Sequence, residues 1–234
     1  MTTPRRPPRL SLIFDADDTL WHNNVLFENV IQRYFDWLAH PTLDRAQLRA
    51  VLAEVELANA RAGGYGARAF LRNLAETFEK LMAKPVSPAQ AAELEVLAEA
   101  LLRHDIELMP EVPAVLGELG GRHDLYLLTK GDAQEQQRKV DASGLAGHFL
   151  AVHIVPEKEP AVYREVAALH GLDPASTWMI GNSPRSDILP ARAAGMNAVY
   201  IPHEQAWWLD HADLAADDGR ILRLPRFSAL REHF

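Results

Sequence analysis

No cysteine occurs among the 234 residues of this chain. Disulfide bonds, zinc sites built from thiolates and cysteine nucleophiles are therefore all excluded. The lack of disulfides is consistent with a reducing compartment, and we expect a cytoplasmic protein. Any catalytic chemistry must come from other side chains.

Long apolar runs and an excess of positive charge are missing as well. No stretch of about 18 apolar residues is present, so we expect no membrane-spanning helix and no membrane partner. The net charge is −8 and the pI is about 5.7, which argues against a nucleic-acid partner bound through a basic surface. The basic opening segment, MTTPRRPPRL, has no apolar stretch behind it, so we expect a mobile tail rather than a secretory signal.

Five short apolar runs have the length and composition of buried strands in a parallel sheet. They are LSLIF (10–14), LYLLT (125–129), AVHIV (151–155), TWMIG (177–181) and AVYIP (198–202). Helices with proline near the start or glycine just past the end are expected at 110–120, 132–144, 160–171 and 187–195. This alternation predicts an α/β protein with a Rossmann-like parallel sheet covered on both faces.

The stretch from about residue 25 to 105 contains no clear strand. Apolar residues recur three and four positions apart along it, which is typical of amphipathic helices. Ser87 and Pro88 form an N-cap and first-turn pair in front of one of them. We therefore expect an α/β core at 1–22 and 106–234, interrupted after its first strand by a helical unit at 23–105.

Three aspartates, Asp15, Asp17 and Asp18, follow the first predicted strand. Parallel sheets bind their ligands at the carboxyl ends of the strands. Carboxylates at such an end can bind Mg²⁺, attack as a covalent nucleophile or act as a general acid and base. The simpler alternative is a solvated turn with an aspartate N-cap.

The ends of the other predicted strands carry complementary groups. Thr129 and Lys130 end the second strand, Lys158 follows the third, and Asn182 and Asp187 follow the fourth. Taken singly, each is an ordinary surface or turn residue. Because the carboxyl ends of parallel strands share one edge of a sheet, together they supply what is needed to hold a phosphoryl group and a metal.

In these residues the sequence resembles the haloacid dehalogenase (HAD)-like hydrolase superfamily. The four motifs of that superfamily are matched in order by DADDT (15–19), Thr129, Lys158 and GNSPRSD (181–187). The resemblance covers about residues 9–24 and 105–225 and implies a HAD fold. The helical insert matches the family's cap domain only in position and class.

The resemblance implies a catalytic role for each motif residue. Asp15 would be the nucleophile and Asp17 the general acid and base. Thr129 and Lys158, with Lys130 beside Thr129, would bind the phosphate. Lys158 would also offset the crowded carboxylates.

The resemblance also implies a Mg²⁺ site. Asp15 and Asp187 would bind the ion through their side chains and Asp17 through its backbone carbonyl. Asn182 is the fourth candidate residue of the metal site. Many family members have an acidic residue at this position, whereas Asn182 is a neutral side chain that still forms hydrogen bonds. We expect Mg²⁺ to bind, with an affinity that the missing charge weakens.

These assignments favour a Mg²⁺-dependent phosphomonoesterase that acts on a small phosphorylated metabolite through an aspartyl phosphate. Asp17 favours phosphoryl transfer, because dehalogenases of the family lack an aspartate two residues after the nucleophile. A phosphomutase and a non-catalytic ligand-binding module remain as alternatives. Asp18 is expected to be structural.

Three further residues are candidates for substrate specificity: His22, Tyr65 and Arg68. Tyr65 and Arg68 lie in the glycine-rich segment ARAGGYGARAF (60–70), where glycine would let the backbone approach a ligand. An ordinary helix–helix loop and a structural histidine are the alternatives. No chemistry is expected of the C-terminal segment, which has a Trp207–Trp208 pair, an edge strand at RILRL and a final helix at FSALREHF.

Overall fold

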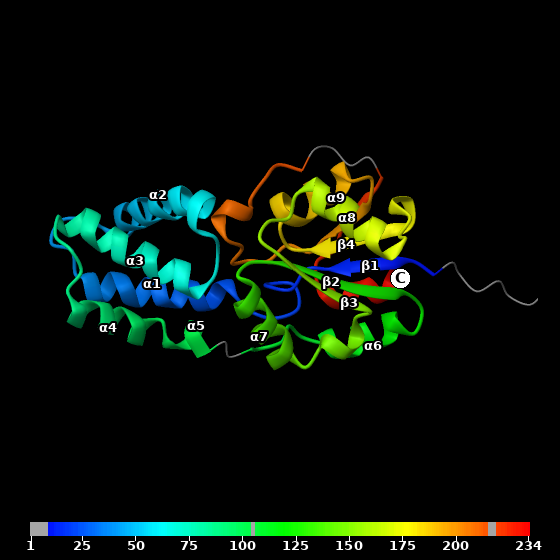
Figure 1. Cartoon of the computed structure of the whole chain (residues 1–234), viewed down its shortest axis with the longest axis horizontal. Coiled ribbons are helices and arrows are strands. Elements are labelled where there is room, and N and C mark those ends of the chain that lie inside the picture. The colour runs from blue at the N-terminus through cyan, green and yellow to red at the C-terminus, as the bar shows by residue number, and fades with distance from the viewer. Residues whose placement is uncertain (1–8, 104–105, 215–218) are drawn as a thin grey trace, which may run out of the picture.

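The computed structural model describes residues 9–103, 106–214 and 219–234. Most of the expected N-terminal tail lies outside the described residues. The expected domain boundary after residue 105 also lies at the edge of a range that is not described. A parallel sheet with its covering helices forms one side of the molecule, and a group of helices forms the other (Figure 1). None of the helices in the described ranges has the length and apolar character that crossing a membrane requires.

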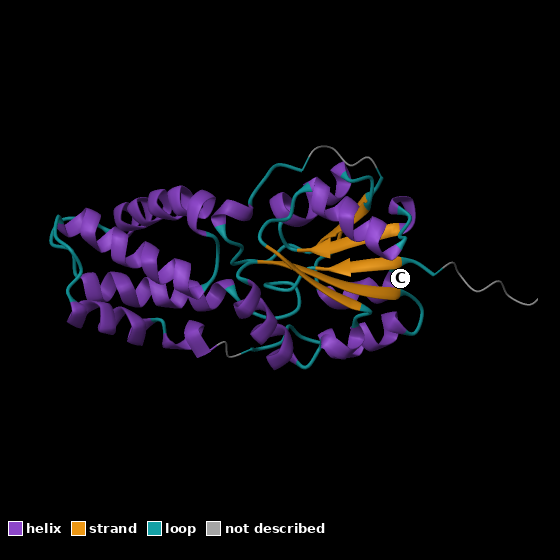
Figure 2. Cartoon of the chain, in the orientation of Figure 1, coloured by secondary structure: helices purple, strands orange, loops and turns teal. Residues whose placement is uncertain are grey.

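The sheet has six strands, all parallel, in the order β3-β2-β1-β4-β5-β6. Figure 2 shows the strands side by side with helices around them. Their bounds are β1 Ser11–Phe14, β2 Asp124–Lys130, β3 Ala151–Val155, β4 Thr177–Gly181, β5 Asn197–Tyr200 and β6 Ile221–Arg223. The five predicted strands and the predicted edge strand are all confirmed. Strand β1 lies between β2 and β4, where the chain order reverses, and open α/β sheets bind ligands beyond the strand ends at such a point.

Helices cover both faces of the sheet, as the alternating pattern predicts. Helices α6 (Val112–Gly120) and α7 (Ala133–Ser143) lie on one face, and α8 (Pro160–His170) and α9 (Leu189–Ala193) on the other (Figure 1). Residues of β1 alternate between the two cores. Leu12 and Phe14 pack with α6, whereas Ile13 packs with α8 and α9.

The second group of helices is inserted between β1 and β2. Its bounds are α1 Asn24–Leu38, α2 Arg45–Gly63, α3 Ala67–Met82, α4 Pro88–Leu97 and α5 Glu99–Arg103. These helices pack around an apolar cluster of their own, which contains Tyr34, Leu52 and Leu74. The Ser87 side chain caps α4 in a reciprocal capping box with Gln90, as the Ser-Pro pair predicts. The division into a core and a cap domain stays a prediction.

Two predicted helices differ from the structure. The segment expected as one helix at 187–195 is a π-helical turn, Pro184–Ile188, followed by the short α9. The final segment forms a 3₁₀ helix, Phe227–Glu232, rather than an α-helix. Both differences concern the type of helix, which is defined by the spacing of its backbone hydrogen bonds. The periodicity of apolar residues does not specify that spacing.

Candidate active site

Lys158 joins the carboxylates that follow β1 and β4. Its Nζ lies 2.5 Å from Asp15 Oδ1 and 2.7 Å from Asp187 Oδ1. All three side chains are buried, with residue exposures of 4% for Lys158, 7% for Asp15 and 0% for Asp187. The strand-end argument therefore predicts the right neighbours, because residues far apart in sequence meet at one edge of the sheet.

The charges of this group do not balance. The pKa of Asp15 is raised from 3.8 to about 6, chiefly by burial and then by the negative charge of Asp187, while Lys158 opposes both. Burial alone would lower the pKa of Lys158, but the two carboxylates hold it above its ordinary range. A single ammonium thus faces two carboxylates, which leaves a favourable position for a further cation.

Asp187 depends on a glycine for its place. A Cβ atom added at Gly181 would lie 2.2 Å from Asp187 Oδ2, so only glycine leaves room for this carboxylate beside the end of β4. The backbone N–H of Ser183 donates to the same oxygen over 2.9 Å. Asp187 lies in the π-helical turn Pro184–Ile188, a rare geometry that is often found at functional sites.

Asn182 is buried next to the nucleophile candidate. Thr19 Oγ1 lies 3.1 Å from Asp15 Oδ2 and 3.3 Å from Asn182 Oδ1. Asn182 therefore occupies the position beside the carboxylates that the sequence indicates, as a neutral group. Thr19, the last residue of DADDT, was not singled out as a site residue from the sequence.

Asp17 faces a different cation. Lys139 Nζ lies 3.0 Å from Asp17 Oδ2, and Gln136 Nε2 donates to the same oxygen over 3.2 Å. Trp21 Nε1 donates to Asp17 Oδ1 over 2.7 Å and completes a tight turn after β1. Gln136 and Lys139 lie three residues apart on α7, so both face Asp17, but no motif in the sequence distinguishes them.

Asp18 makes structural contacts, as expected from the sequence. Its carboxylate accepts the backbone N–H groups of Asn23 and Asn24, at the start of α1. Its backbone has a positive φ of 59°, which aspartate tolerates better than most residues. The pKa of Asp18 is raised from 3.8 to about 7, mainly by burial, while the two N–H donors oppose the shift.

The two residues at the end of β2 point to different partners. Thr129 Oγ1 lies 2.6 Å from Gln136 Nε2. Lys130 Nζ donates to Ser186 Oγ over 2.8 Å and lies 4.5 Å from the centre of the Tyr65 ring. The nearest acidic groups to the Lys130 ammonium are Glu157 and Asp210, at 3.7 Å each.

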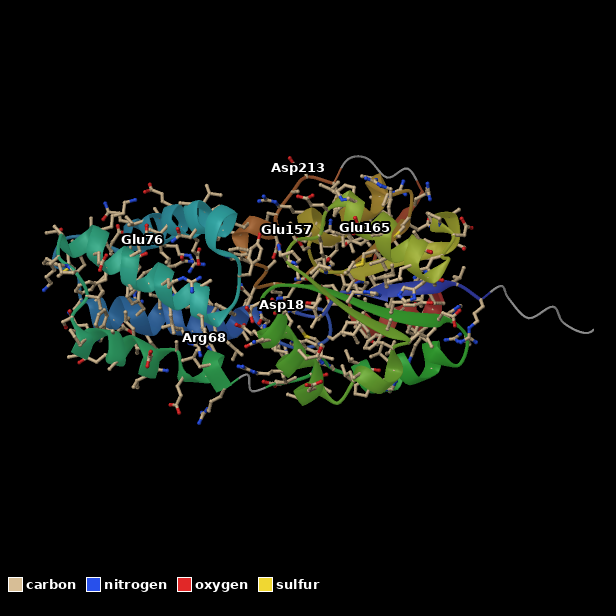
Figure 3. All side chains as sticks on the ribbon, viewed as in Figure 1. Asp18, Arg68, Glu76, Glu157, Glu165 and Asp213 are labelled. Carbon is tan, nitrogen blue, oxygen red and sulfur yellow. The ribbon has the colours of Figure 1, made fainter. Side chains whose placement is uncertain are left out.

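A cavity of about 150 Å³ opens over these residues, between the sheet edge and the inserted helices. At about 30 Å³ per water, that volume has room for about five water molecules, the size of a small metabolite. In Figure 3, Asp18 and Glu157 lie at this junction. The predicted site residues that line the cavity are Asp15, Asp17, Tyr65, Thr129, Lys130, Lys158, Asn182 and Asp187.

Two of the specificity candidates lie elsewhere. Arg68 is exposed on α3 and is not among the described residues that line the cavity, because Ala67, Ala69 and Phe70 face inward instead. His22 lies beside the cavity rather than in its wall, and its ring packs edge-on against His203 at 6.1 Å. Neither position supports the contact with substrate that the sequence suggested.

The C-terminal segment contributes to the site, contrary to the expectation that it has no chemistry. Trp207 and Asp210 line the cavity, and the Trp207 ring packs edge-on against Tyr65 at 5.9 Å. Asp210 Oδ1 accepts a hydrogen bond from Ser183 Oγ over 2.9 Å. This loop follows β5, so its position follows from the same strand-end rule, but no motif distinguishes it.

The side chains around Asp15 and Asp187 determine whether a metal ion fits this site. In residues 9–103, 106–214 and 219–234, no group of three or more histidine, aspartate or glutamate side chains is arranged to hold an ion. Two buried carboxylates, Asp15 and Asp187, share one ammonium and carry excess negative charge. Hard oxygen ligands with unbalanced charge suit Mg²⁺, which commonly takes one or two carboxylates and keeps several waters.

Comparison with known proteins gives matches to hydrolases and phosphatases. A model of the haloacid dehalogenase-like hydrolase family matches residues 11–195. Phosphoserine phosphatase of Thermus thermophilus is 31% identical over 179 residues, which cover 72% of this chain and 68% of that enzyme. Mouse N-acylneuraminate-9-phosphatase is 33% identical over 102 residues, covering 42% of this chain and 41% of that enzyme. A haloacid dehalogenase-like family hydrolase from Xanthomonas campestris superposes with a TM-score of 0.83 at 28% identity, covering 96% of this chain and 90% of that one.

Proposed function

The chain belongs to the haloacid dehalogenase-like hydrolase family, and we propose that it is a Mg²⁺-dependent phosphomonoesterase that hydrolyses a small phosphorylated metabolite through an aspartyl phosphate. The observation that carries the proposal is the Lys158 bridge between Asp15 and Asp187 at the base of a cavity. Asp17, two residues after Asp15, lies in the same wall. Two relatives named as phosphatases support the same reaction class.

In the first step, a carboxylate oxygen of Asp15 attacks phosphorus and the bond from phosphorus to the leaving oxygen breaks. Asp17 gives its proton to that oxygen, which leaves as an alcohol. In the second step, Asp17 takes a proton from water, whose oxygen attacks the phosphorus of the aspartyl phosphate. The Asp15 carboxylate is regenerated, and phosphate is released.

The surrounding residues stabilise the charge that these steps move. Lys158 lies beside Asp15, where its ammonium can hold the phosphoryl oxygens. Thr129 offers a hydroxyl from the neighbouring strand end. Asp15, Asp187 and the backbone carbonyl of Asp17 would hold Mg²⁺. When bound, the ion supplies positive charge that lets an anionic ester approach an anionic nucleophile.

The inserted helices serve as a cap in this proposal. Tyr65, between α2 and α3, donates a hydrogen bond to Glu157 over 2.6 Å and so connects the inserted segment to the loop after β3. Burial, followed by the bond to Glu157, raises the pKa of the Tyr65 phenol, which keeps it a hydrogen-bond donor. A cap in this position covers the site and supplies part of the wall that holds the substrate.

A phosphate-release screen over small phosphomonoesters, with and without Mg²⁺, tests the proposal. We expect turnover that requires Mg²⁺ and that Asp15→Asn lowers by about 10³-fold or more, as for loss of a nucleophile in other hydrolases. Thermal unfolding of the variant serves as the folding control. Absence of phosphate release from every ester, including p-nitrophenyl phosphate, would favour a binding module. Transfer of the phosphoryl group within the substrate, without release, would identify a phosphomutase.

A further inference from the structure

The wall of the cavity that comes from the inserted helices holds polar side chains that the proposed reaction does not use. Arg49 and Glu56 on α2 and Asn73 on α3 line the same cavity as Asp15 and Lys158. Apolar side chains, Phe27 and Phe70 among them, lie in the wall as well. Charged groups in a largely apolar wall are typical of positions that orient a ligand.

Arg49 has hydrogen-bonding capacity to spare. Its Nη2 donates to Glu28 Oε2 over 2.9 Å. Its Nη1 is buried, and among the described residues no acceptor lies within hydrogen-bond distance of it. A buried donor without a partner is costly and rare in folded proteins. An acceptor on a bound molecule would remove that cost, and a carboxylate matches a guanidinium best.

Glu56 presents the opposite charge in the same wall. Its residue exposure is 5%, and its carboxylate accepts a hydrogen bond from Trp208 Nε1 over 3.1 Å. Burial raises the pKa of Glu56, with Trp208 and the positive charge of Arg49 opposing it. An ionised carboxylate can accept further hydrogen bonds, so a cationic group could bind beside the tryptophan contact.

A guanidinium with a spare donor and a carboxylate with spare acceptors, both on α2, form a charge pattern that a zwitterion complements. A purely anionic group would meet Glu56, and a purely cationic group would meet Arg49. We propose that Arg49 binds the carboxylate and Glu56 the ammonium of the leaving group, so that the substrate is the phosphate ester of a small hydroxyl-bearing amino acid. This inference rests on the proposed phosphomonoesterase function.

Four matched esters separate the two contacts. O-phosphoserine has both charged groups, 3-phosphoglycerate only the carboxylate, phosphoethanolamine only the ammonium, and glycerol 3-phosphate neither. We expect kcat/KM to be highest for O-phosphoserine and lowest for glycerol 3-phosphate, by roughly 100-fold or more if each contact contributes about tenfold.

Two variants assign the contacts to residues. Arg49→Gln should lower kcat/KM by roughly 10–100-fold for the two carboxylate esters and change the other two by less than about threefold. Glu56→Gln, whose amide oxygen can still accept from Trp208, should do the same for the two ammonium esters. Arg45→Gln is the matched control, since Arg45 lies on the same helix, is 53% exposed and pairs with Asp36 away from the cavity.

The possible results differ for the two proposals. If the wild type hydrolyses all four esters equally, or if each variant loses the same factor on all four, Arg49 and Glu56 only stabilise the helices and the inference is wrong. Thermal unfolding of both variants distinguishes a misfolded protein from a changed preference. If p-nitrophenyl phosphate is also not hydrolysed with Mg²⁺ present, it is the phosphatase function itself that fails.

Discussion

The ammonium of Lys158 lies 2.5 Å from Asp15 Oδ1, so the candidate nucleophile and its cation are in direct contact although 143 residues separate them. Replacing such a buried cation with a neutral side chain leaves carboxylates unpaired, which typically costs about 3–5 kcal/mol. Variants that leave both Lys158 and Asp15 in place are therefore better tests of mechanism. None of the variants proposed below substitutes either residue.

Asp17→Asn separates proton transfer from nucleophilic attack. We expect kcat for an alkyl phosphate to fall by about 10²–10⁴-fold, because the leaving alcohol needs a proton. The loss should be smaller for p-nitrophenyl phosphate, whose leaving group is stable without one. Steady-state rates on the two esters provide the measurement. An equal loss on both would show that Asp17 does not act as the acid.

Gly181→Ala tests the close approach of Asp187 to the end of β4. The added Cβ would meet Asp187 Oδ2 at 2.2 Å, so the carboxylate must move. A displacement of about 1 Å in a catalytic site can cost roughly 10²-fold in rate, and we expect a loss of that order. Gly117→Ala on α6 is the control, since nothing lies within 4 Å of its added Cβ. Full activity of Gly181→Ala would contradict the assignment of Asp187.

Asn182→Asp restores a charge beside the carboxylates. With Mg²⁺ absent, a further carboxylate near Asp15 should lower the melting temperature, because Lys158 already faces two. With Mg²⁺ present, the variant should reach half-maximal activity at a lower Mg²⁺ concentration than the wild type. Titrations of activity and of melting temperature against Mg²⁺ supply both readouts. Equal half-saturating concentrations would refute the weakened affinity expected for Asn182.

A histidine pair, His153 on β3 and His170 at the end of α8, predicts a pH dependence of stability. His153 Nε2 and His170 Nε2 lie 2.8 Å apart, so one ring must donate and the other accept. Burial, and then the neighbouring His170, lower the pKa of His153 below 6.5. The unfolded chain therefore binds more protons than the folded one as pH falls through 6.5, and folding stability decreases.

Denaturant unfolding between pH 5 and pH 8 checks this sign. The free energy of unfolding of the wild type relative to His153→Gln should increase with pH across that range. The raised pKa values of Asp15 and Asp18 add a slope of opposite sign, but they add it to both proteins. His233→Gln, at an exposed position near the C-terminus, serves as the control. A slope that is the same in the wild type and in His153→Gln would exclude the histidine pair as its source.

Much of the fold could be predicted from the sequence because its strands are short, apolar and buried on both faces. The same reasoning identifies Asp15, Thr129, Lys158 and Asp187, since parallel strands end at a common edge of the sheet. Asp15 and Thr129 depend only on where their strands stop. Lys158 and Asp187 lie in the loops after β3 and β4, so the motif resemblance was needed to single them out.

The remaining site residues depend on how loops and helices pack. Lys139 reaches Asp17 from α7, and Trp207 reaches the cavity from the loop after β5, neither of which a local pattern specifies. Tyr65 was predicted and does line the cavity. Arg68, three residues later, is exposed because its neighbours on α3 fill the inward face. Whether such a residue reaches the cavity depends on which face of the helix its side chain occupies relative to the cavity, and tertiary packing determines that.

The central place of β1 has a consequence for synthesis of the chain. The strand that leads to Asp15 is made before the other strands of the sheet, yet it pairs with β2 on one side and with β4 on the other. A growing chain that folds its inserted helices still lacks Lys158 and Asp187. Since domains form as the chain emerges from the ribosome, this edge of the sheet can assemble only after β4 and the turn that carries Asp187 have been made.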